Sequence, residues 1–427
     1  MKKQSGFHYA WITLLALCII VGLGKGGLNN TAGQFLPFVT EDLGIGMGKI
    51  SLYFSVSAVV TMLFLPIGGK IMSKYDTRLI LVIGIILQGG AFALFGAMNS
   101  AWGWYVLAIP LAVGGVFITV IAGPVIINQW FKKKSGLALG ILSAAGGLIG
   151  IIVQPVTGNL IESQGWRFTY IALGVAVIAI IVPAILLLIK RSPEAKGVQP
   201  YGAEETSDAS AQQEDTSNQG ISIRIARKST AFYALVVFFF LITSIASFSM
   251  HIPQFLVDKG FNPAAAGSVM GIYMVGVLIG SLAIGMLTDK IGSKITAVLT
   301  MVIGLISMGL LMGVSSSTTI ISLAVGMFGV VASSIGTIGP ALASSLFGNK
   351  EYSQIYSMAS MGLAISSIVA IPVYGFIYDT FNNYSVALIV IIAMLVINIL
   401  SILIAFKSKN ELVKAGHWNS EVEEVKA

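Results

Sequence analysis

The second half of this chain repeats the first at a nearly constant spacing, and this feature constrains the fold more than any other. Gly123-Pro124 returns as Gly339-Pro340 after 216 residues, and Pro155 returns as Pro372 after 217. The other repeated positions pair Asp42 with Asp258, Gly44 with Gly260, Gly69 with Gly285, Lys74 with Lys290, Arg78 with Lys294, Gly158 with Gly375 and Glu162 with Asp379. Self-similarity of this length indicates two equivalent halves.

The composition places both halves in a membrane. The chain is 56% hydrophobic and 10% charged, with a mean hydropathy of +0.89, whereas soluble domains have about 25% charged residues. Apolar stretches of about 20 residues can cross a bilayer as helices. We expect twelve of them in two six-helix bundles, near 8–35, 50–72, 79–98, 102–129, 136–160, 167–189, 230–256, 264–288, 294–314, 318–346, 352–378 and 384–406.

The basic residues predict the orientation of the spans. With both termini in the cytoplasm, 21 of the 25 Lys and Arg lie inside, while Lys49, Arg167 and Lys259 lie outside and Lys25 lies within a span. The first span has an internal counterpart in the second repeat, so we expect it to be retained rather than cleaved as a signal peptide. These observations predict a multi-pass protein of the cell membrane.

Several other classes of function lack candidate residues. The net charge of +7 follows from membrane topology, so we expect no nucleic-acid partner. Cys18 is the only cysteine and the three histidines are far apart in the sequence, so we expect no disulfide, no metal and no cofactor. An intramembrane enzyme is the weakest hypothesis, because the spans contain no acid/base pair or nucleophilic triad.

We expect four segments along the chain. Residues 1–189 form the N-terminal six-helix bundle and residues 230–406 the C-terminal one. Residues 190–229 form a cytoplasmic linker whose Ser-, Gln- and acid-rich middle predicts disorder, and residues 407–427 form a charged cytoplasmic tail.

The loop after the eighth span has the sequence Gly285-Met-Leu-Thr-Asp289-Lys290-Ile-Gly292-Ser-Lys294. It resembles the loop signature of the major facilitator superfamily, Gly-x-x-x-Asp-Arg/Lys-x-Gly-x-Arg/Lys. The first-repeat copy keeps Lys74 and Arg78 but has Ser73 in place of the acid and Asp76 in place of the second glycine. The resemblance implies a twelve-helix carrier in which these five acidic and basic residues, Asp289, Lys290, Lys294, Lys74 and Arg78, act in gating. The alternative is that they serve only turn geometry and topology.

A shorter stretch is similar to the monocarboxylate and oxalate:formate branch of that superfamily. It comprises Asn128-Gln-Trp130-Phe-Lys-Lys-Lys134-Ser-Gly136-Leu-Ala-Leu-Gly140 and, further on, Gly165-Trp-Arg167. Members of this branch place arginine in helix eight, and the oxalate carriers also place lysine in helix eleven; neither is present here. Dicarboxylate transport is therefore disfavoured.

Lys25 is the strongest candidate for substrate binding. It lies roughly 26 Å along the first span, and no span interior contains Asp or Glu to neutralise it. A lone ammonium in hydrocarbon costs about 3 kcal/mol or more, so a substrate carboxylate is one partner and the outer headgroups or helix-end carbonyls are the alternative. Asn29, Asn30 and Gln34 add amides to the same end of the span.

The second half offers Tyr273, Ser333, Ser334, Thr337 and Ser366 as further substrate-binding candidates, although Ser and Thr commonly bond to carbonyls of their own helix. His251 could exchange protons, or be satisfied structurally. The sequence thus predicts a secondary active transporter of a small organic anion, most simply a monocarboxylate, with protons as possible co-substrate and lipids as surroundings. An exporter of neutral or amphiphilic compounds is the alternative, and a non-transporting membrane sensor is a third reading.

Overall fold

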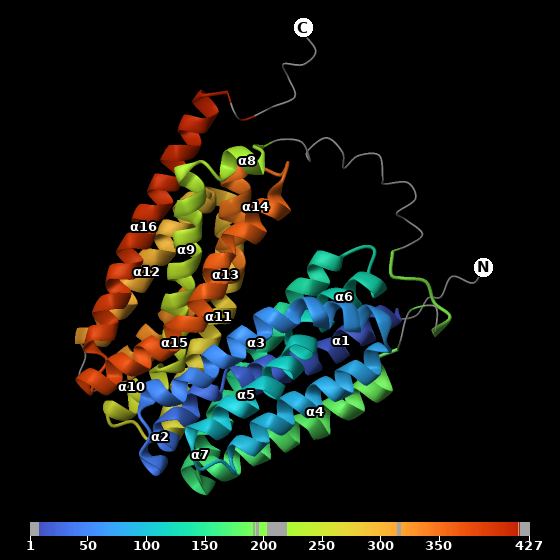
Figure 1. The fold of residues 1–427 in the computed structure, drawn as a ribbon, viewed down its shortest axis with the longest axis vertical. Helices are drawn as coiled ribbons and strands as arrows, with labels where there is room; N and C mark the ends of the chain where they lie inside the picture. Colours follow the sequence, from blue (N-terminus) through green and yellow to red (C-terminus); the bar gives the residue numbers. More distant parts are fainter. Residues whose placement is uncertain are drawn as a thin grey trace. The chain divides into compact units, whose positions relative to one another are not determined.

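The computed structural model describes residues 8–190, 193, 196–202, 220–313, 317–416 and 418, and most of these residues are helical (Figure 1). The chain divides into two compact units. Unit 1 comprises Met1–Ser210 and Phe261–Gly271, and unit 2 comprises Ala211–Gly260 and Ile272–Ala427. The described part contains 11 helices that are long and apolar enough to cross a membrane.

Unit 1 contains the first six expected spans. Its helices are α1 (Tyr9–Gly22), η1 (Leu23–Asn29), η2 (Ala32–Phe35), α2 (Leu36–Leu43), α3 (Met47–Lys74), α4 (Thr77–Phe95), α5 (Ala101–Gly115), η3 (Val116–Ile121), α6 (Ala122–Trp130) and α7 (Ser135–Leu188). Within α7, Gly165 has φ 83° and ψ 163°, a conformation that a residue with a Cβ rarely adopts. The backbone breaks there into two spans, so the prediction of twelve transmembrane helices is confirmed.

Glycine sets the spacing between helices in unit 1. The first half of α7 packs against α1 and η1, and its second half packs against α4. A Cβ added to Gly174 of α7 would meet the carbonyl of Gly89 and lie 2.7 Å from Cβ of Ala93. Such close approach of backbones is the usual basis of helix association in lipid. It explains why glycine concentrates in these spans.

Unit 2 contains the second set of spans. Its helices are α8 (Ile223–Ala226), α9 (Thr230–Ser247), η5 (Phe248–Met250), α10 (Ile252–Asp258), the larger part of α11 (Pro263–Ile291), α12 (Ser293–Gly313), α13 (Thr318–Phe347), α14 (Tyr352–Ala359), α15 (Met361–Phe381) and α16 (Ser385–Lys414). Helix α9 packs against α13, α15 and α16, and α12 packs against α13 and α16. The buried rings of Phe248, Phe328, Tyr374 and Tyr384 fill the space beside α9 and η5.

Both ends of the linker are attached to helices. Tyr201 forms a β-bridge with Phe131 in unit 1, and Gly220 forms one with Gly348 in unit 2. Phe131 and Gly348 lie at corresponding ends of the fourth and tenth spans, so the two repeats hold the linker in similar ways. The predicted disorder concerns residues 203–219, which lie outside the described residues.

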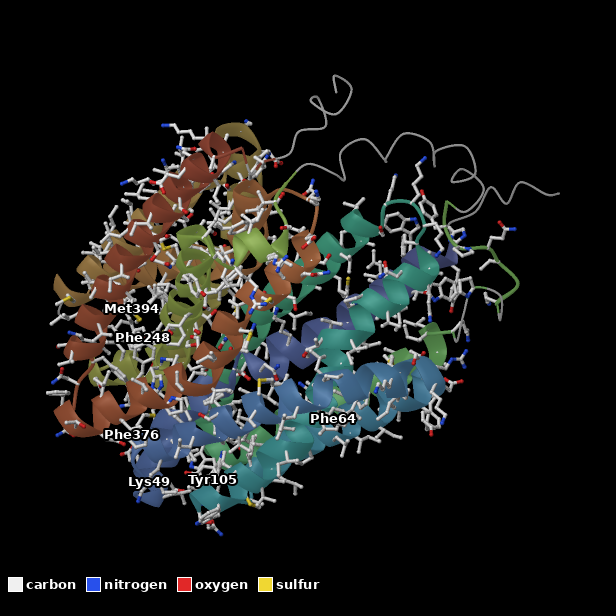
Figure 2. All side chains as sticks on the ribbon, turned by 45° about the horizontal axis from the view of Figure 1, so that its top comes forward. Lys49, Phe64, Tyr105, Phe248, Phe376 and Met394 are labelled. Carbon is white, nitrogen blue, oxygen red and sulfur yellow. The ribbon has the colours of Figure 1, made fainter. Side chains whose placement is uncertain are left out.

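Apolar side chains cover much of the outer surface of both units. Leu187 is 69% exposed and Ile152 is 64% exposed, which suits helices surrounded by lipid. Figure 2 shows the side chains on the ribbon; Lys49 and Tyr105 lie near each other at one end of unit 1, where the Tyr105 hydroxyl donates to the Lys49 carbonyl at 2.6 Å.

Candidate functional site

Lys25 lies in a π-helical stretch of the first span. The backbone N–H of Asn30 donates to the Lys25 carbonyl at 2.9 Å, five residues back. Short π-helical insertions occur frequently at functional sites, because the extra residue redirects side chains. Lys25 is exposed, whereas Gly24 and Gly26 on either side are buried. The aliphatic stem of Lys25 lies against Gly146 of α7, whose added Cβ would be 3.4 Å from Cδ of the lysine.

A second polar group adjoins this stretch from α4. Gln88 is fully buried, and its Nε2 donates to the Gly24 carbonyl at 3.2 Å and to Oδ1 of Asn29 at 3.1 Å. Asn29 itself is exposed. Gln88 is not among the residues predicted from the sequence, although a lone amide in the apolar span Thr77–Phe95 is a signal of a specific polar role.

Further along the span, amides tie the chain to α7. Gln34 donates from Nε2 to Oε1 of Gln154 and to its carbonyl oxygen, and Gln154 donates in turn to the Asn30 carbonyl at 2.8 Å. Gln34 is 3% exposed and Gln154 is fully buried. The structure thus places Lys25 and Asn29 on an exposed surface and Gln34 within the packing of the unit. A role of Asn30 or Gln34 in binding stays a prediction.

The hydroxyl groups of α13 bond within their own helix. Ser333 donates to the Val330 carbonyl at 2.7 Å, Ser334 to the Val331 carbonyl at 2.5 Å and Thr337 to the Ser333 carbonyl at 3.2 Å. This is the structural alternative that the sequence left open. Their role in substrate binding stays a prediction.

Tyr273 and Ser366 are buried in unit 2. The ring of Tyr273 packs against Phe328, with centroids 6.1 Å apart. The hydroxyl of Ser366 lies 2.8 Å from that of Ser244 on α9, and joins α15 to α9. The substrate contacts predicted for these two residues remain predictions.

His251 lies at the join of η5 and α10 and is fully buried. Its Nδ1 is 2.9 Å from the Tyr384 hydroxyl, and its Nε2 is 2.8 Å from the Ile371 carbonyl. Because a carbonyl can only accept, Nε2 carries a proton and donates. Both ring nitrogens therefore hold neighbouring elements together, and the predicted proton-coupling role stays a prediction.

The two loop signatures differ in backbone geometry. Gly292 has φ 83°, the conformation for which the signature glycine is suited. Its first-repeat counterpart, Asp76, has φ −63° and accepts from the backbone N–H of Arg78 at 2.8 Å as the N-cap of α4. Asp76 thus replaces a turn glycine with a helix cap. The candidates Lys74, Asp289, Lys290 and Lys294 are exposed and Arg78 is half-buried; their gating role stays a prediction.

Among the described residues, no group of three or more His, Cys, Asp or Glu could hold a metal ion. The polar groups near Lys25 are amides and backbone carbonyls, which donate and accept hydrogen bonds.

Two relatives of known type are similar to this chain. The mouse protein "Monocarboxylate transporter 11" is 21% identical over 398 residues, which cover 90% of this chain and 84% of that protein. The "Oxalate:formate antiporter" of Oxalobacter formigenes is 25% identical over 182 residues, or 42% of each chain. Both relatives are named as transporters, and neither name describes an enzyme.

A solved structure shares the fold. A bacterial homologue of the human lysosomal transporter Spinster, in an inward-facing and occupied conformation, aligns with a TM-score of 0.72 at 13% identity and covers 97% of this chain and 100% of its own. The sequence profile of the Major Facilitator Superfamily matches residues 14–272 and again residues 257–422. The chain is therefore a multi-pass, non-enzymatic transport protein, and it belongs to the Major Facilitator Superfamily.

Proposed function

We propose that this protein moves a small monocarboxylate across the cell membrane by alternating access, linked to protons or to exchange with a second anion. Both termini lie in the cytoplasm. Residues 1–189 and 230–406 form the two moving bundles, joined by residues 190–229 and followed by the tail 407–427. The exposed ammonium of Lys25 inside the first span is the main support for this function.

The position of Lys25 favours an anionic partner. Burying a charge at this depth costs about 3 kcal/mol or more unless a counter-charge or water accompanies it. Glycines at 24 and 26 let α4, η3 and α7 approach the backbone beside it, and the aliphatic stem of Lys25 lies against Gly146. A carboxylate that binds there replaces the missing acidic side chain.

The amides strengthen this preference. Oδ1 of Asn29 already accepts one hydrogen bond from Gln88, which leaves one lone pair on Oδ1 and the two N–H donors of Nδ2. Lys25 offers only donors. A surface that presents donors from a cation and an amide favours a carboxylate over a cation, because charge-assisted hydrogen bonds are the stronger ones.

The test is the binding of labelled formate, acetate, lactate and pyruvate to purified protein. Lys25→Ala should weaken binding of the preferred acid by about tenfold or more, since a hydrogen bond to a charged group contributes about 1.5–3 kcal/mol. Lys49→Ala is the matched control, because Lys49 is an exposed lysine in the first turn of α3, at the end of its span. Equal affinities for the wild type and Lys25→Ala would show that Lys25 does not bind the substrate. If folded protein binds none of the acids, export of a neutral or amphiphilic compound becomes the leading function.

A further inference from the structure

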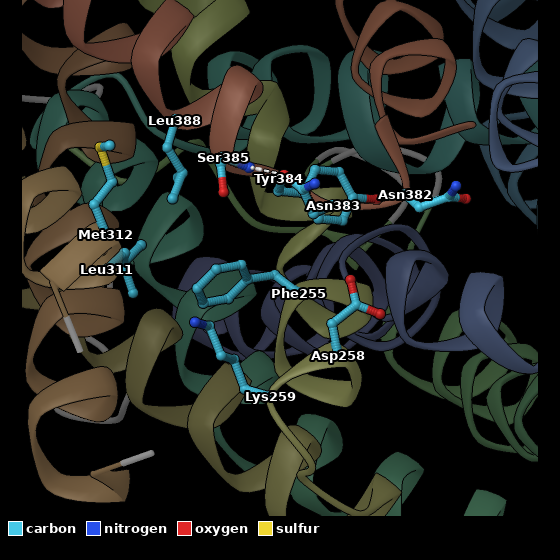
Figure 3. A pocket seen from close by; sticks show the side chains of 10 residues that line it. All are labelled: Phe255, Asp258, Lys259, Leu311, Met312, Asn382, Asn383, Tyr384, Ser385 and Leu388. Atoms are coloured by element: carbon cyan, nitrogen blue, oxygen red, sulfur yellow. Dashed lines mark hydrogen bonds between the residues drawn. The ribbon is translucent and has the colours of Figure 1, made fainter. Parts of the chain in front are cut away.

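Unit 2 contains a second candidate site, far along the chain from the Lys25 stretch. It is a cavity of about 230 Å³ where α10 and α12 end and α16 begins (Figure 3). Its polar wall consists of Asp258, Lys259, Asn382, Asn383, Tyr384 and Ser385, and its apolar wall of Phe255, Leu311, Met312 and Leu388. The charge distribution along the chain assigns these helix ends to the outer side of the membrane. The cavity therefore combines charge and apolar surface at a membrane boundary.

The internal repeat shows what is unusual about Asp258. Its first-repeat counterpart, Asp42, forms an ion pair with Arg167 at 3.2 Å. The position equivalent to Arg167 is Tyr384, which lacks a positive charge. Oδ1 of Asp258 accepts instead from two neutral donors, Gln254 at 2.8 Å and Tyr378 at 2.9 Å.

The charge of Asp258 is therefore only partly compensated. Burial raises the pKa of the Asp258 carboxyl, and the hydrogen bonds from Gln254 and Tyr378 and the charge of Lys259 oppose that shift without cancelling it. Lys259 is its neighbour in the chain, and its Nζ lies 5.6 Å from the centroid of the Phe255 ring. Asp258 and Lys259 thus contribute a carboxyl group and an ammonium group to the lining of one cavity (Figure 3), a pattern complementary to a ligand that carries both charges.

The neighbouring surface is suited to hydrocarbon. Met312 is 44% exposed and Ile389, next to Leu388, is 54% exposed. A Cβ added to Gly309 or Gly313 of α12 would meet nothing within 4 Å. An acyl chain can therefore lie along this face of α12, which leads away from the cavity towards the middle of the span.

We propose that this cavity binds the headgroup of phosphatidylethanolamine from the outer leaflet. The lipid ammonium donates to Asp258, the phosphate contacts Lys259, and an acyl chain lies along Gly309 and Met312. Asn383 takes no direct part, because its amide already bonds to the Phe381 carbonyl at 2.7 Å and to the Ser385 N–H at 2.9 Å. Asn383 stabilises the turn before α16, which lines the cavity.

The experiment is native mass spectrometry of the detergent-purified protein with phosphatidylethanolamine, phosphatidylcholine and phosphatidylglycerol of identical acyl chains. The wild type should retain phosphatidylethanolamine about fivefold more than either other lipid, because only its headgroup donates N–H bonds to a carboxylate at a partly exposed site. Equal retention of the three lipids would overturn the proposal and needs no variant.

Two variants test the separate roles of the Asp258 carboxylate and the Lys259 ammonium. Asp258→Asn should abolish the preference, whereas Asp42→Asn, the same change in the other repeat, should leave it intact. Lys259→Gln should lower retention of all three lipids about equally, since all carry a phosphate. This variant tests the cavity as the binding site if Asp258→Asn does not fold. A preference that survives in folded Asp258→Asn would overturn the site. Competition by soluble glycerophosphoethanolamine at equal concentration would overturn its assignment to a lipid.

Discussion

The packing that holds Lys25 in place can be tested with two adjacent glycines. A Cβ added to Gly26 would meet the Gly146 carbonyl, and it would lie 2.9 Å from the backbone nitrogen of Gly150 and 3.3 Å from Cβ of Ile149. A Cβ added to Gly27 would lie 3.7 Å from Cγ2 of Val177, which is ordinary van der Waals contact. Gly26→Ala therefore forces two backbones apart, and Gly27→Ala does not.

The expected difference follows from these contacts. Overpacking against atoms that cannot rotate away costs about 1–3 kcal/mol. Both substitutions gain the same helix propensity, about 1 kcal/mol, so that term cancels between the variants. A difference of 1–3 kcal/mol corresponds to a gap of about 2–12 °C in melting temperature for a unit of this size.

The assay is the apparent melting temperature of each purified variant in one detergent at one heating rate, which matters because membrane proteins often unfold irreversibly. Gly26→Ala should melt below both the wild type and Gly27→Ala. If Gly26→Ala melts at or above Gly27→Ala, the close approach of η1 and α7 is wrong, and the position of Lys25 derived from it is wrong as well.

Three further predictions concern charged groups. Asp289→Asn should slow uptake into proteoliposomes by about threefold or more if the carboxylate interacts with a helix N-terminus during gating; a normal rate at equal incorporation would contradict this role. Arg167→Met should lower the melting temperature more than Asp42→Asn. Both changes remove the ion pair, which is partly exposed and contributes about 1 kcal/mol or less, but Arg167→Met also removes the hydrogen bonds to the carbonyls of Gly96 at 3.3 Å and Met98 at 3.1 Å. Equal decreases in melting temperature would contradict this reasoning. The pKa of Asp258 is raised in the folded protein, so its contribution to stability is present below its ordinary pKa of 3.8 and lost as pH rises through the raised value. Melting curves against pH should show this fall in the wild type and not in Asp258→Asn.

The sequence predicted the fold because its strongest signals are physical requirements of a bilayer. Apolar length determines where helices cross, and Gly123-Pro124 and Pro155 recur in the second half in the way that two repeats require. The same approach located the exposed Lys25, since a charge inside a span is conspicuous in any apolar sequence.

Other features depend on contacts between distant segments. The π-helical stretch around Lys25 and the bond from Gln88 to Asn29 arise from packing of α4 and α7 against the first span, which no local pattern encodes. Hydroxyl groups on α13 could face a substrate or their own carbonyls, and composition cannot choose between the two. The attachment of the linker at Tyr201 also needed the structure, because the surrounding sequence favours disorder.

We propose above that this protein carries a monocarboxylate bound at Lys25. Counterflow in proteoliposomes tests it most directly: vesicles loaded with one unlabelled acid are diluted into the same labelled acid, for the wild type, Lys25→Ala and Lys49→Ala. We expect transient accumulation of one monocarboxylate by the wild type and Lys49→Ala, and its loss in Lys25→Ala. Accumulation by Lys25→Ala equal to that of the wild type, or none for any acid with correctly folded protein, would contradict it.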